Sequence, residues 1–263
     1  MTTTKRILNC IPSRETERDW RIRHALQSGV LTTGAAIPTS VDLREVWWGI
    51  GDQGQTGSCV GWASADAVIR WHMVKAGRLS GNQLLSPRFQ WMAAKETDEF
   101  VSEPTTFIES AGTSLKAALD IARRYGSVED RFLPFATGAL YPGEEQTLYA
   151  IAAQRRIASY FNASLGMGHG LAEWRSWIAN HGPLLVRLDV DATWDNATAT
   201  EGKLDDYRSD TVRGGHAVAL VGYTVDRFIV RNSWGTSWGK DGFAFASEGY
   251  ASAAFTEAYG ITV

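Results

Sequence analysis

Cys59 stands in a glycine-rich loop directly before a predicted helix, in the stretch "GDQGQTGSCVGW" at 51–62. Glycine-rich loops permit unusual backbone angles and close approach of another backbone, and such loops more often serve a site than a core. The first turn of a helix favours negative charge because its N–H groups are unsatisfied, and this lowers the pKa of a thiol placed there. These features make Cys59 a candidate nucleophile; the other interpretations are a metal ligand and a small buried side chain.

His216 and Asn232 are the candidate partners of this thiol. His216 begins a predicted strand in "RGGHAVALVGY", and Asn232 ends the next one in "VRNSWG". Adjacent antiparallel strands bring two such residues together, and an imidazole bonded to an amide oxygen is held in one tautomer, ready to accept a thiol proton. Taken alone, each residue also fits a structural role. No third ligand follows at a spacing typical of metal sites, so no metal is predicted.

Helices must position Cys59. Apolar residues recur at helical spacing after the glycine loop and predict a helix from about Ser58 to Ala76, with Cys59 in its first turn. Caps and apolar spacing predict further helices beginning at Pro87 after the cap Ser86, at 115–125 after the cap Ser114, near 144–157 and at 171–181.

Strands must position His216 and Asn232. After Pro183 the helical period gives way to alternation in "LLVRLDV", with Val186, Leu188 and Val190 on one face, and the strands "GHAVALVGY", "DRFIVRNSW" and "GFAFAS" follow. Helices followed by mostly antiparallel strands indicate an α+β fold with two lobes, and a site is expected in the cleft between them.

Composition excludes several classes of protein. The 263 residues are 44% hydrophobic and 21% charged, as in an ordinary globular protein, and the net charge of -3 gives no argument for binding nucleic acid or membrane. Two cysteines cannot form a disulfide framework, the start lacks the apolar core of a signal peptide, and no run approaches the length of a membrane span. We therefore expect a cytoplasmic location.

From about Pro38 to its end, the chain resembles the papain-like cysteine peptidases, the C1 family of papain and the cathepsins. "DQGQTGSC" is similar to the family's Gln-Gly-x-x-x-Ser-Cys loop, with Gln53 six residues before the cysteine. "GGHAVALVGY" and "VRNSWGTSWGKDGF" resemble the family's histidine and asparagine segments, and "AGTSLKAALDIARRYG" resembles the helix after the glycine wall of its substrate cleft. Four motifs in the family's order carry the resemblance.

The resemblance implies a role for each matching residue. Cys59 would attack the scissile carbonyl, His216 would act as general acid and base, and Asn232 would orient His216. The Gln53 side chain and the backbone N–H of Cys59 would form the oxyanion hole, and Trp234 would shield the bond between asparagine and histidine from water. The glycines expected to bind substrate are Gly112, Gly214 and Gly215.

The implied fold is papain-like, with a helical left lobe mainly at 50–130, a β-rich right lobe mainly at 131–263 and the active site between them. The implied function is hydrolysis of peptide bonds in peptide or protein substrates through a thioester acyl-enzyme, without metal or organic cofactor. The alternatives are a papain-fold amidase or transpeptidase and a non-catalytic peptide-binding module. The sequence does not indicate an oligomeric state.

The chain also departs from the family. Val60 replaces the usual tryptophan after the nucleophile, and Thr56 replaces a cysteine that anchors a common disulfide, as in bacterial, archaeal or viral members. Tyr259 stands where a near-terminal cysteine is usual, and counting five residues from it passes Val263, so the usual floor residue of the S2 pocket beside Gly214 and Gly215 is missing. Either water or the carboxylate of Val263 would fill that place.

Residues 1–37 are read as an N-terminal arm or short pro-segment. "ETERDWRIRHAL" mixes charged and aromatic residues, and we expect Ile22 and Leu26 to pack one side of a short helix together with Trp20. On this interpretation the arm supports the fold; the alternative is a short autoinhibitory segment.

Overall fold

The computed structural model describes residues 6–31, 36–97, 111–136, 141–165 and 170–263. Its α-helices are α1 (Ile22–Gln27), α2 (Cys59–Gly61), α3 (Arg70–Lys75), α4 (Pro87–Thr97), α5 (Leu115–Arg124), α6 (Glu145–Ala152), α7 (Leu171–Asn180) and α8 (Glu248–Ala254). Its strands are β1 (Val41–Asp42), β2 (Ser159–Asn162), β3 (Leu184–Val190), β4 (Lys203–Leu204), β5 (Gly214–Tyr223), β6 (Arg227–Arg231), β7 (Phe243–Ser247) and β8 (Phe255–Thr262). Within the described ranges, no helix has the length and apolar character needed to cross a membrane.

The helix that carries Cys59 is continuous over three segments. Cys59 opens α2, the π-helical segment Trp62–Ile69 follows without a break, and α3 completes the helix. The predicted helix from about Ser58 to Ala76 is confirmed. A Cβ on Gly61 would lie 2.2 Å from the carbonyl oxygen of Pro87, so only glycine lets the start of this helix approach α4 so closely.

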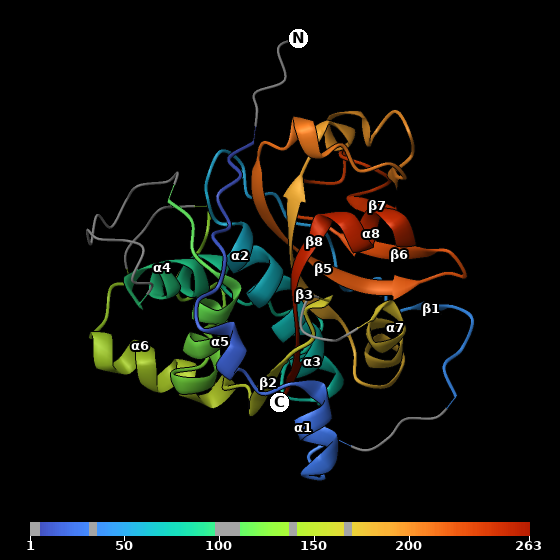
Figure 1. Cartoon of the computed structure of the whole chain (residues 1–263). Helices are drawn as coiled ribbons and strands as arrows, with labels where there is room; N and C mark the ends of the chain where they lie inside the picture. Colours follow the sequence, from blue (N-terminus) through green and yellow to red (C-terminus); the bar gives the residue numbers. More distant parts are fainter. Residues whose placement is uncertain (1–5, 32–35, 98–110, 137–140, 166–169) are drawn as a thin grey trace.

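The predicted caps set the beginnings of α4 and α5. The backbone N–H of Phe89 donates to Ser86 Oγ at 3.0 Å, and that of Ala117 donates to Ser114 Oγ at 3.3 Å. The helix α6 packs beside them on the helical side of the molecule, although it lies in the range assigned above mainly to the β-rich lobe (Figure 1).

A single large sheet forms the other side of the molecule. The strand order is β2-β8-β3-β5-β6-β7-β4, with β1 also paired to β5, and each of these pairs is antiparallel except β4 with β7. The strands predicted from "LLVRLDV", "GHAVALVGY", "DRFIVRNSW" and "GFAFAS" are confirmed as β3, β5, β6 and β7. The helical side and the mostly antiparallel sheet together confirm the predicted α+β class (Figure 1).

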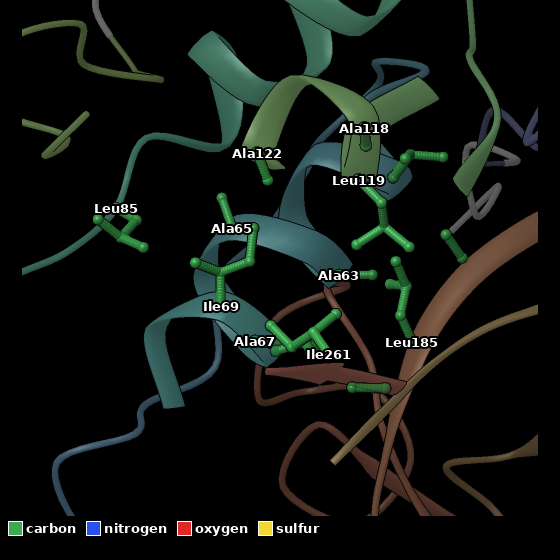
Figure 2. Close-up of a cluster of buried hydrophobic side chains, with 14 of the residues drawn as sticks. Ala63, Ala65, Ala67, Ile69, Leu85, Ala118, Leu119, Ala122, Leu185 and Ile261 are labelled. Atoms are coloured by element: carbon green, nitrogen blue, oxygen red, sulfur yellow. The ribbon is translucent and has the colours of Figure 1, made fainter. Parts of the chain in front are cut away.

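Both faces of this sheet are buried. On one face, Leu185 and Ile261 join the helical residues shown in Figure 2, among them Ala65, Ile69 and Leu119. On the other face, a second cluster gathers the residues that α7 and α8 cover, and it contains the predicted stripe Val186, Leu188 and Val190. The helix of Cys59 is thus clamped between α4 and α5 on one side and the sheet on the other.

The expected short helix in the N-terminal arm exists as α1, but its buried face differs from the prediction. Ile22 and Ala25 are buried, whereas Trp20 and Leu26 are 58% and 37% exposed. Trp20 lies before the helix, where its carbonyl accepts a bond from the Asn162 backbone at the edge of the sheet, so it does not share the helix periodicity.

A buried ion-pair network joins the helical side to the sheet. Asp66, 4% exposed, accepts from Arg70 at 3.0 Å and from Arg231 at 2.7 Å. Arg70 lies on the same helix as Asp66, whereas Arg231 ends β6 on the sheet. Arg70 and Arg231 are each 2% exposed, so the carboxylate lies between two buried cations.

We expect Asp66→Asn to lower the free energy of unfolding by about 3–5 kcal/mol, because it leaves two buried guanidinium groups without their counter-charge. Urea unfolding followed by tryptophan fluorescence measures the change. Lys240→Ala is the matched control, because its ion pair with Glu201, 3.8 Å long and exposed, is expected to contribute less than ~1 kcal/mol. A loss for Asp66→Asn as small as that of the control would contradict the expectation.

Candidate active site

Cys59 lies where the helical side meets the sheet, and its thiol is fully buried. It interacts with the His216 side chain and with the Ala217 backbone on β5, and it accepts a hydrogen bond from Cys10 of the N-terminal arm. These contacts lower the pKa of Cys59 well below the ordinary thiol value. The hydrogen bond from Cys10 is the largest cause; burial opposes ionisation, and the interactions with His216 and with the Ala217 backbone lower the pKa further.

His216 and Asn232 meet as the sequence predicts. Antiparallel pairing places Ala219 on β5 opposite Arg231 on β6, so Asn232, the next residue, runs back towards the beginning of β5. His216 Nε2 lies 2.8 Å from Asn232 Oδ1, and both residues are buried. Because this bond occupies Nε2, the imidazole can meet the Cys59 thiol only through Nδ1, a buried atom without a hydrogen-bond partner among the described residues.

Gln53 is buried in the loop before Cys59, and two hydrogen bonds hold its side-chain amide in place. Its Nε2 donates to the Thr56 carbonyl at 3.0 Å, and its Oε1 accepts from Ser233 Oγ at 2.9 Å. An amide nitrogen carries two hydrogens, so the bond to Thr56 leaves one of them for another acceptor. Ser233 follows Asn232 directly, and its bond therefore ties the loop of Cys59 to the asparagine segment.

Tryptophan rings enclose the bond between His216 and Asn232. The Trp234 ring lies 4.9 Å from the imidazole, and the Trp194 ring meets the imidazole edge-on at 5.6 Å. Trp238 stacks on Trp194 at 4.9 Å. Trp234 is the ring that the sequence analysis expected as a shield. The other two rings were missed, although Trp238 could have been found because it lies in the asparagine motif "NSWGTSWG".

The three glycines predicted to bind substrate face the N-terminal arm. A Cβ on Gly112 would meet the Asn9 carbonyl at 1.8 Å, and one on Gly214 would meet the Leu8 carbonyl at 2.3 Å. Gly215 would likewise meet the Cys10 carbonyl at 2.2 Å. Arm residues 8–10 thus lie against bare backbone, and side chains on these glycines would push them away.

Backbone hydrogen bonds fix the arm at this place. The N–H of Cys10 donates to the Gly215 carbonyl at 2.9 Å, and the N–H of Ile11 donates to the Thr113 carbonyl at 3.2 Å. One bond goes to the sheet and the other to the loop before α5, so the arm bridges the two sides of the molecule. Figure 1 shows this blue segment running past α2 and α5 on its way to α1. We call 112–113 and 214–215 together the arm-binding surface.

The position expected for Val263 is wrong. Along β3, Leu185 pairs with Tyr259 of β8, whereas Asp189, four residues further on, pairs with Gly215 of β5. Val263 lies beyond Tyr259 in the direction that leads away from Gly215, at the other end of the sheet. The residues after Tyr259 continue along β8, and β8 runs away from His216, so Val263 cannot lie beside Gly214 and Gly215.

Cys10 is the neighbour of Cys59 that sequence reasoning missed. It is 2% exposed, and its pKa is raised well above the ordinary thiol value by burial and by its hydrogen bond to Cys59. No spacing rule links these two residues, because the arm reaches the site through tertiary structure. Its one sequence signal is that it is the only other cysteine of the chain.

Metal ligands do not gather at this site. In the part of the chain that the structure describes, no three histidine, cysteine or acidic side chains form a group that could hold a metal ion.

Comparison with solved structures supports the fold. Xylellain, a cysteine protease from Xylella fastidiosa, matches with a TM-score of 0.79 at 22% identity, over 100% of this chain and 99% of that one. Procathepsin L2 from the larval midgut of Tenebrio molitor matches with a TM-score of 0.72 at 20% identity, over 98% of this chain and 78% of that one. These likenesses confirm the predicted papain-like fold.

Sequence relatives agree with this fold. Mouse cathepsin K is 25% identical over 214 residues, and the match covers 79% of this chain but only 59% of that protein. Cathepsin B-like CP3 from Giardia intestinalis is 26% identical over 236 residues, covering 85% of this chain and 73% of that protein. The family model described as papain family cysteine protease matches residues 37–261. This chain therefore belongs to the papain family of cysteine proteases.

Proposed function

We propose that this chain hydrolyses peptide bonds through a thioester acyl-enzyme formed on Cys59. The observation that carries the proposal is the alignment of three side chains: a thiol of lowered pKa, an imidazole next to it, and an amide oxygen 2.8 Å from the far nitrogen of that imidazole. Family membership supports the same reaction.

In the first half of the reaction, the Cys59 thiolate attacks the carbonyl carbon of the substrate and its oxygen becomes an oxyanion. The free hydrogen of Gln53 Nε2 and the backbone N–H of Cys59 stabilise that charge. The protonated His216 then donates its Nδ1 proton to the amide nitrogen as the carbon–nitrogen bond breaks, and the amine leaves.

In the second half, His216 takes a proton from water, and the resulting hydroxyl attacks the thioester carbonyl. The carbon–sulfur bond breaks and the acid leaves, which restores the thiolate and the protonated imidazole. Asn232 keeps the ring oriented through both halves, and the rings of Trp234 and Trp194 exclude water from that bond, which strengthens it.

The arm-binding surface is the proposed place for an extended substrate, because the backbone N–H groups of Cys10 and Ile11 already bond to its Gly215 and Thr113 carbonyls. Substrate therefore binds only after these residues leave. The later part of the arm packs on the body of the protein, where Lys116 pairs with the buried Asp19 at 2.6 Å. The segment at 8–11 blocks the site, and the segment at 19–25 supports the fold.

One experiment separates this proposal from its alternatives. A peptide library is incubated with the full chain, with and without an added amine, and the products are identified by mass spectrometry. Cleavage supports the peptidase; products joined to the added amine would indicate a transpeptidase. Binding without any product would indicate a non-catalytic module. Cys59→Ala is the control in which each covalent product should disappear.

Gln53→Ala should lower kcat on the order of 10²-fold, because it removes one donor to the developing oxyanion. Steady-state kinetics with a fluorogenic peptide measures the effect. Ser233→Ala is the matched control: it removes the bond that holds Gln53 Oε1 but keeps the donor, so a smaller loss is expected. A change in KM alone for Gln53→Ala would show that this amide binds the ground state, against the proposed role.

Cys10→Ala should raise the pKa of Cys59 towards the ordinary thiol value of about 8.5, because the hydrogen bond from Cys10 is the largest cause of its lowering. Cys10→Ser keeps a donor and should leave the pKa lower than Cys10→Ala does. Thiolate absorbance in the ultraviolet, recorded against pH, measures both variants. Identical titrations of the two would contradict the assigned cause.

A further inference from the structure

We propose that Cys10 and Cys59 form a reversible disulfide that ties the N-terminal arm over the active site and protects the nucleophile from irreversible oxidation. The proposal concerns regulation of the cysteine assigned above and so rests on the proposed function. The oxidant it requires is a peroxide, and the reductant is a dithiol.

The fold brings together the only two thiols of the chain. Cys10 and Cys59 are both free and both buried in the same hydrophobic cluster, where each side chain perturbs the pKa of the other. The two residues are far apart in the sequence, and they meet because the arm crosses the site. Any disulfide within one chain must therefore join these two residues.

The backbone on both sides of Cys10 is anchored, which fixes its position over Cys59. Its N–H donates to the Gly215 carbonyl at 2.9 Å, and its carbonyl accepts from Arg187 Nε at 3.0 Å. The next residue, Ile11, donates to Thr113 at 3.2 Å. Few main-chain movements are open to Cys10 without breaking one of these bonds, so its sulfur stays beside that of Cys59.

The two thiols differ in the way that a peroxide reaction requires. Burial and the interaction with Cys59 raise the pKa of Cys10, whereas the interaction with Cys10 lowers that of Cys59, so Cys59 ionises more readily than Cys10 does. In the first step, the Cys59 thiolate attacks one oxygen of the peroxide and the oxygen–oxygen bond breaks, so that Cys59 becomes a sulfenic acid. The departing oxygen takes the proton of the protonated His216 and leaves as an alcohol or water.

In the second step, the Cys10 sulfur attacks the sulfenic sulfur and the new sulfur–sulfur bond forms. The hydroxyl leaves with the Cys10 proton as one molecule of water, so the two sulfurs together have lost two electrons to the peroxide. A dithiol returns two electrons and two protons and restores both thiols. In the absence of Cys10, further peroxide would carry the sulfenic acid to the sulfinic acid, which a dithiol does not reduce.

The consequence is a closed and protected enzyme. The bonded Cys59 cannot attack a substrate, and arm residues 8–11 cannot leave the arm-binding surface. Reduction would therefore both regenerate the nucleophile and allow the arm to move.

The test treats the full chain with hydrogen peroxide, blocks the remaining thiols with iodoacetamide, and measures intact mass and peptides without reductant. We expect one chain to lose the mass of two hydrogen atoms, to show a linked pair of peptides containing Cys10 and Cys59, and to lose its peptidase activity. Dithiothreitol should restore that activity. Sulfinic acid at Cys59 with an alkylated Cys10, or links only between two chains, would overturn the proposal.

Cys10→Ser is the matched variant. Cys10→Ser keeps a hydrogen-bond donor beside Cys59, so before oxidation it should cleave the fluorogenic peptide; after peroxide it should lose activity that dithiothreitol does not restore. Recovery equal to that of the unaltered chain would overturn the protective role. The mass measurement needs no activity, so a reduced chain that forms the disulfide but cleaves nothing would refute the proposed function and leave this inference standing.

Discussion

The position of the candidate nucleophile depends on the buried carboxylate of Asp66. This residue lies two turns after Cys59 on one continuous helix, and its partner Arg231 directly precedes Asn232. The 2.7 Å ion pair between them thus connects the element that carries the thiol to the element that carries the orienting amide. A buried carboxylate between two guanidinium groups has few alternative arrangements, because each alternative leaves a charge unpaired in the interior. The register between helix and sheet, and with it the approach of Cys59 to His216, follows from this constraint.

The features that sequence reasoning predicted well are those with local signals. Caps at Ser86 and Ser114 and apolar spacing fixed the helices, and alternation fixed β3. The pairing of His216 with Asn232 followed because one hairpin joins them. The strands β2 and β8 carried weak alternation and pair with distant partners, so they were not predicted. The error over Val263 has the same origin, since the register of β8 is set by its neighbours in the sheet.

Local sequence signals also could not predict that the arm crosses the site. The crossing depends on contacts between the arm and the arm-binding surface. The contacts at Gly112, Gly214 and Gly215 are made by the backbone of the arm, and two of its N–H groups are satisfied by carbonyls of the body. Main-chain bonding of this kind recognises an extended chain with little regard to its side chains. The bare glycines therefore accept residues 8–10 with little regard to their side chains, so the sequence of the arm carries no signal of where it binds.

The arm has two opposite effects on Cys59. Its backbone covers the candidate nucleophile, while the Cys10 thiol is the largest of the causes that lower the pKa of Cys59. When the arm leaves, that hydrogen bond is lost together with much of the burial that opposes ionisation. The interactions with His216 and with the Ala217 backbone remain, because they come from β5 and do not depend on the arm. In the open enzyme the reactivity of Cys59 thus depends on how firmly Asn232 and the surrounding tryptophans hold the imidazole, and this is the physical reason for so much aromatic surface around a single hydrogen bond.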